Sequence, residues 1–201
     1  MRYVSGFENQ VITSEFETSE LKKLPAAIDR FNESRYFAQQ FSNLDAKEEN
    51  LPQANWFLSA YFAAVISIRE AAELDMLNLG YSSQMFKNTS MAKETFMPSD
   101  GGEQSENDPL AINRMFKDIR NLRVHFALPL VNVVNSVFVL NYVTSESLHK
   151  LRRAQVTEAE AAQFHSFTKT SDLNKLLFQH LFIQRQLIIA LSELTKELQT
   201  V

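Results

Sequence analysis

A run of apolar residues from Trp56 to Ile68 constrains the fold more than any other segment, because only Ser59 and Ser67 interrupt it. A helix that is apolar on nearly every face must be covered on several sides. We therefore expect residues 52–79 to form the central helix of a bundle, ended by Gly80. The run is shorter than the roughly 20 residues that cross a bilayer, so we expect no membrane span.

Composition points to helices and to a single domain over residues 1–201. Only 4 Gly and 5 Pro occur, too few turn residues for a many-stranded sandwich or barrel. The absence of cysteine excludes thiol catalysis, disulfides and Cys-ligated zinc, and it fits a cytoplasmic protein. A net charge of −4 confines any contact with nucleic acid to a local basic patch. The first residues carry no signal-peptide pattern.

Helical spacing and capping signals place most of the remaining elements. We expect a loosely ordered lead-in over 1–18, a helix from Ser19 onwards, and a long polar loop over 81–107 with a short helix around 89–96. Asp108-Pro109 starts a helix that runs to about Leu128. Ser171-Asp172 caps the last helix, and Thr157 opens a short one before it.

Residues 131–143 fit two interpretations. Their β-branched side chains, with Asn135-Ser136 placed like a tight turn, suit a small hairpin over 131–141. We expect a continued helix instead, because an isolated hairpin is weakly stable. The predicted fold is therefore an all-α, up-and-down bundle of four to six helices, with the hairpin as the alternative.

The helix after Asp108 concentrates the chemistry of the chain. It carries cations at every third position and then a histidine: Arg114, Lys117, Arg120, Arg123 and His125. Asn121 and His125 are four residues apart and share a face, so the amide can orient the imidazole. Arginine can stabilise charge that grows on a phosphate, and histidine can move a proton near neutral pH. These residue types suit metal-free cleavage of RNA, in which the 2′-hydroxyl is the nucleophile.

Arg120-Asn121-Leu122-Arg123-Val124-His125 resembles the motif of the HEPN superfamily, in which an arginine, a polar residue and three variable positions precede a histidine. The resemblance covers residues 52–128. It implies a homodimer that brings two motifs into one cleft and cleaves RNA without a metal or cofactor. It also implies a toxin or defence role, sometimes beside an antitoxin protein. By position, Arg120 would bind phosphate, Asn121 would orient and His125 would be the acid/base. Arg114, Lys117 and Arg123 are candidate RNA contacts, and the simpler alternative is that they form a solvated charged face.

Other interpretations of the same residues stay open. A non-catalytic HEPN-like module could bind RNA, a nucleotide or a protein, and an adaptor could use the motif only to pack a dimer. Arg120 and His125 would then be a salt-bridged arginine and a histidine at a packing boundary. The remaining histidines, His149, His165 and His180, lack metal-ligand spacing. We expect the aromatic residues at helical spacing to lie in the core; these are Trp56, Tyr61, Phe62, Phe178 and Phe182.

Overall fold

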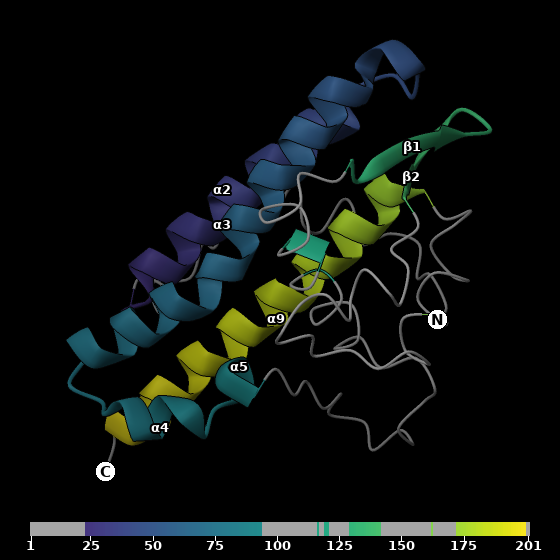
Figure 1. Cartoon of the computed structure of the whole chain (residues 1–201). Coiled ribbons are helices and arrows are strands. Elements are labelled where there is room, and N and C mark those ends of the chain that lie inside the picture. Colours follow the sequence, from purple (N-terminus) through teal and green to yellow (C-terminus); the bar gives the residue numbers. More distant parts are fainter. Residues whose placement is uncertain are drawn as a thin grey trace.

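The computed structural model describes residues 23–93, 116, 119–120, 129–141, 162 and 172–199. The described residues are mostly helical, with one small antiparallel hairpin. Helix α2 (Pro25–Ser42) and helix α3 (Leu51–Asn78) lie side by side, and α9 (Leu173–Gln199) runs along both (Figure 1). The expected helical class is confirmed, and so is a helix over residues 52–79.

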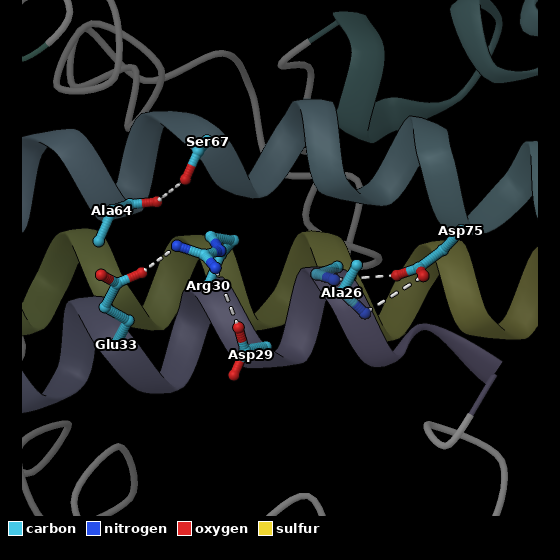
Figure 2. A network of polar contacts seen from close by, with 8 residues as sticks. Ala26, Asp29, Arg30, Glu33, Ala64, Ser67 and Asp75 are labelled. Carbon is cyan, nitrogen blue, oxygen red and sulfur yellow. Dashed lines mark hydrogen bonds and ion pairs between the residues drawn. The ribbon is translucent and has the colours of Figure 1, made fainter.

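Helix α2 runs antiparallel to α3 after a short connection that includes a 3-10 turn, η2 (Glu48–Asn50). Their contact includes a tertiary cap, shown in Figure 2. The buried Asp75 carboxylate of α3 accepts hydrogen bonds from the backbone N–H groups of Ala26 (3.2 Å) and Ala27 (2.9 Å) at the start of α2. Leu24, the residue before α2, supplies no side-chain cap, so α3 satisfies amides that the first turn leaves open. Burial raises the pKa of Asp75, and these two hydrogen bonds oppose the rise.

Gly80 ends α3 as the sequence predicts. Its φ of +90° is a conformation that side chains disfavour. The Gly80 N–H donates to the carbonyl of Leu77, and the Tyr81 N–H donates to that of Met76, both at 3.0 Å. This pair of bonds is the Schellman arrangement, which satisfies the last carbonyls of a helix and turns the chain away.

Two short helices follow where we expect mainly loop. Helix α4 (Ser83–Lys87) is capped by Ser82, whose hydroxyl accepts from the Met85 N–H, and α5 (Ser90–Lys93) coincides with the start of the short helix expected around 89–96. Helix α5 contacts α9 near its C-terminal end. Residues 94–107, the lead-in over 1–18 and Thr157 lie outside the described residues.

Residues 131–141 form the hairpin, so the expected continuation of helix is wrong. Strand β1 (Val131–Val134) pairs with β2 (Val137–Leu140), and the turn residues Asn135 and Ser136 have φ of 51° and 60°. Positive φ at both positions suits the right-handed twist of a two-residue hairpin. The hairpin is not isolated, because it contacts α3 and α9, and the ring of Phe138 lies 5.1 Å from that of Phe41. This packing supplies the stability that an isolated hairpin lacks.

One predicted core aromatic lies outside the core. Trp56 is 73% exposed, whereas Tyr61, Phe62 and Phe178 are buried as expected and Phe182 is partly buried. The Trp56 indole stacks on the neighbouring Phe57 ring, with centroids 6.4 Å apart. Apolar residues on nearly every face of α3 led to the wrong expectation, because α3 leaves one face uncovered. No helix in the described part of the chain is long and apolar enough to cross a membrane.

Candidate functional site

Arg120 is the one predicted site residue within the described residues. Arg120 is helical and partly exposed. Residues 116 and 119 are also helical, in agreement with the expected helix after Asp108. Asn121 and His125, the other proposed catalytic residues, lie outside the described residues. So do the predicted RNA contacts Arg114, Lys117 and Arg123.

Phe116 anchors the start of this segment in the core. Its ring lies 5.0 Å from the ring of Phe62 on α3 and 4.8 Å from the ring of His180 on α9, the second contact at 88°. Phe116 and Ile119 are both buried. Arg120 follows Phe116 by four residues, so it lies one helical turn further along the same face. Core packing therefore places the backbone that carries Arg120.

His180 belongs to a buried polar network and is not exposed to a substrate. Its Nδ1 lies 2.7 Å from the Tyr61 hydroxyl, which also reaches the Leu177 carbonyl at 3.3 Å, and its Nε2 lies 3.3 Å from the Gln184 side-chain nitrogen. One donor order satisfies all three contacts: Gln184 donates to Nε2, Nδ1–H donates to Tyr61, and Tyr61 donates to Leu177.

Burial fixes the charge state of this network. It lowers the pKa of His180 to about 3 and raises the pKa of Tyr61 well above 10. Both groups are therefore neutral at pH 7. His180 is a structural histidine, which makes it unsuited to proton transfer near neutral pH.

Asn55 of α3 holds the chain where it returns after the motif. Its side-chain oxygen accepts from the backbone N–H groups of Leu130 (2.6 Å) and Val131 (3.2 Å), and its amide donates to the Leu51 carbonyl at 2.8 Å. Leu130 and Val131 are buried. The backbone that enters β1 is therefore fixed to α3 by one side chain.

The two anchor points lie on the same side of α3. Asn55 and Phe62 are seven residues apart, which is two helical turns and about 10 Å along the axis. Phe62 contacts residue 116, and Asn55 binds the backbone of residues 130–131. The segment between them contains the whole Arg-Asn-x-x-x-His pattern. Within the described ranges, no three His, Cys, Asp or Glu side chains gather as metal ligands.

Sequence reasoning missed three of the residues that build this region. Phe116 was not identified as a core residue, although Phe116 and Ile119 are both buried. Asn55 and His180 were not identified as anchors, because an Asn or His within an apolar helix gives no indication of its partner. The detectable signal was the polar residue itself, since a buried Asn must find hydrogen-bond partners.

Comparison of the chain with protein-family models, with curated proteins and with solved structures gives no match.

Proposed function

We propose that this chain is a HEPN-like helical protein that cleaves RNA as a metal-independent endoribonuclease. Arg120 binds the scissile phosphate, Asn121 orients the imidazole, and His125 transfers the proton. Arg114, Lys117 and Arg123 supply the local positive charge that a chain of net charge −4 needs to hold RNA. A second copy of the chain brings a second motif to the same cleft.

The observation that carries the proposal is the Arg120-Asn121-x-x-x-His125 pattern in a segment held to the core at both ends. Phe116 packs between α3 and α9 four residues before Arg120, and Asn55 binds the backbone five residues after His125. Catalytic groups must be kept in register with their substrate by a rigid support. Anchors at both ends supply such a support, and the partial exposure of Arg120 leaves it at the boundary of the core.

The reaction follows from the chemistry of these side chains. A base takes the proton of the ribose 2′-hydroxyl, whose oxygen attacks the adjacent phosphorus. The guanidinium of Arg120 stabilises the negative charge that grows on the phosphate oxygens. The bond to the 5′-oxygen then breaks, and an imidazolium returns a proton to it. The products are a 2′,3′-cyclic phosphate and a 5′-hydroxyl.

Cleavage of mixed RNA in the presence of EDTA tests the proposal. We expect cleavage by the natural chain, and its loss in both Arg120→Ala and His125→Ala. Arg30→Ala is a matched control, because Arg30 pairs with Asp29 and Glu33 on the surface of α2 (Figure 2). RNA that stays intact at high protein concentration would contradict the proposal.

A second candidate is a non-catalytic HEPN-like module that binds protein. Exposed apolar side chains on α3 favour it, notably Trp56 at 73% and Leu74 at 52% exposure. Apolar side chains of this size on a surface often mark sites of protein contact. Intact RNA in the cleavage test, together with stable association through α3, would favour this second function.

A further inference from the structure

Four buried rings from three segments of the chain contact one another in a closed circuit, which we name the four-ring cluster. Tyr61 and Phe62 are consecutive on α3, His180 lies on α9, and Phe116 lies in the segment that carries Arg120. Ring centroids are 5.7 Å apart for Tyr61–Phe62, 5.0 Å for Phe62–Phe116, 4.8 Å for Phe116–His180 and 6.0 Å for His180–Tyr61. Each ring is therefore held by two others of the cluster.

Hydrogen bonds fix the plane of the His180 imidazole within the cluster. The Gln184 side-chain nitrogen is a donor, so Nε2 of His180 accepts from it and carries no hydrogen. A neutral imidazole then has its hydrogen on Nδ1, which donates to the Tyr61 hydroxyl at 2.7 Å. The hydroxyl in turn donates to the Leu177 carbonyl. Bonds at both nitrogens hold the ring in one orientation and assign it the Nδ1–H tautomer.

These bonds distinguish His180 from the apolar rings of the four-ring cluster. Contact between apolar rings favours burial but is non-directional. A hydrogen bond, in contrast, weakens steeply when its angle departs from the preferred one. The imidazole is therefore the member whose orientation is set independently of Phe116, and Phe116 packs against it edge-on at 88°. The place of the Phe116 ring follows from His180 as well as from Phe62.

The place of Phe116 bears on Arg120. Residues 116, 119 and 120 are helical, and residues four apart on a helix share a face. A displacement of Phe116 along or around the helix axis therefore displaces Arg120 in the same sense. Ile119 is also buried, so the core contacts this segment directly beside Arg120.

We propose that His180 is a positioning residue for Arg120. Hydrogen bonds from Gln184 and to Tyr61 set the orientation of the imidazole, and the imidazole sets the place of Phe116 and of the guanidinium one turn further on. His180 acts through Phe116 and transfers no proton itself. The effect on cleavage rests on the proposed ribonuclease activity, whereas the effect on the position of Arg120 does not.

Nitrogen NMR of the chain with isotope-labelled histidine tests the tautomer. We expect the hydrogen on Nδ1 of His180 in the natural chain, with the signal assigned by its loss in His180→Leu. Tyr61→Phe removes the acceptor and keeps the ring. The Gln184 amide should then turn over and the hydrogen should move to Nε2, because a buried N–H without an acceptor is costly. A hydrogen on Nε2 in the natural chain would overturn the proposal.

Hydrogen exchange tests the position of Arg120 without any RNA. Tyr61→Phe and Gln184→Met each remove one partner of the imidazole, and we expect exchange at the Arg120 amide to be at least about tenfold faster in both. Amides of α2 report general unfolding and should exchange as in the natural chain. Gln186→Met is the matched control, because Gln186 is partly exposed on the same helix and outside the hydrogen-bonded chain. Unaltered exchange at Arg120 in both variants, or an equal change in the control, would overturn the proposal.

Steady-state cleavage of RNA tests the consequence for the reaction. We expect kcat to fall at least about tenfold in Tyr61→Phe and Gln184→Met, since a misplacement of about 1 Å can cost a hundredfold. KM should change by less than about twofold, because the charge that Arg120 stabilises grows only in the transition state. The pH profile of kcat should keep its shape, because His180 transfers no proton.

The cleavage and exchange measurements separate the two proposals. If the natural chain cleaves RNA and both variants cleave it equally fast, the positioning role is wrong and the proposed function stands. If the natural chain cleaves no RNA, the proposed function fails, and exchange at the Arg120 amide decides the positioning role alone. Faster exchange confined to the segment of Arg120 supports that role, and unaltered exchange rejects it.

Discussion

The ring of Phe116 meets the ring of His180 edge-on, with centroids 4.8 Å apart and an interplanar angle of 88°. This contact joins the segment that carries Arg120 to α9, and a second contact, with Phe62, joins it to α3. An edge-on pair directs ring hydrogens at the negative face of its partner. The neutral, buried His180 fits this role because it carries no charge that would need solvent.

Truncation of Phe116 should destabilise the protein strongly. Phe116→Ala removes a fully buried ring from between α3 and α9, and such a cavity costs about 3–5 kcal/mol. Urea unfolding followed by circular dichroism measures the loss. Trp56→Ala is the control, because Trp56 is exposed and its removal should change the free energy of unfolding by about 0.5 kcal/mol or less. Equal effects of the two variants would contradict the described packing.

Acid should destabilise the fold through His180. Its folded pKa of about 3 is below the value of about 6.5 in the unfolded chain, so the unfolded chain binds the proton more readily. The contribution of this site to the free energy of unfolding has its full value above pH 6.5. It declines as the pH falls towards 3, by about 1.4 kcal/mol per pH unit. The difference in unfolding free energy between the natural chain and His180→Leu, measured from pH 7 to 4, isolates this site. A difference that is independent of pH would refute the assignment.

The tertiary cap at the start of α2 should contribute about 2 kcal/mol to the free energy of unfolding. Asp75→Ala leaves the amides of Ala26 and Ala27 without their acceptor, and both bonds involve a buried carboxylate. We expect faster hydrogen exchange at these two amides and a lower urea midpoint. Glu70→Ala on the exposed side of α3 is the control and should leave both unchanged. Unaltered exchange in Asp75→Ala would show that the cap is dispensable.

Glycine at position 136 of the hairpin turn should make the protein more stable than the natural serine does. Ser136 has a φ of 60°, and a side chain in this region costs about 1 kcal/mol or more. Ser136→Gly should therefore raise the free energy of unfolding, whereas Ser59→Gly within α3 should lower it by about 0.5 kcal/mol. Thermal unfolding of both variants shows whether each substitution raises or lowers the stability. A loss of stability in Ser136→Gly would contradict the turn geometry.

The sequence predicts the long helices because their signals are local. Pro52 and Gly80 bracket α3, and Asp172 begins α9 by accepting from the Asn174 N–H at 3.0 Å. The hairpin was mispredicted because its stability comes from distant contacts, such as that between Phe41 and Phe138. Periodicity within a single helix does not indicate which faces other elements will cover.

The candidate site shows the same difference between features with local signals and features that depend on distant contacts. The motif that contains Arg120 is visible as a pattern of residue types, because its chemistry depends on side chains close together in the chain. Its supports are Asn55 and His180, which reach it from α3 and α9 across more than 50 residues of sequence. Single-sequence reasoning did not identify these two residues as supports, because the partner of a buried polar residue is set by tertiary packing.

The most direct test of the central claim is mass analysis of the ends of RNA fragments produced in EDTA. We predict a 2′,3′-cyclic phosphate on one fragment and a 5′-hydroxyl on the next. We also predict no cleavage where the scissile ribose lacks its 2′-hydroxyl, and no fragments with Arg120→Ala or His125→Ala. Fragments that persist in either variant, or that form from a 2′-deoxy substrate, would contradict it.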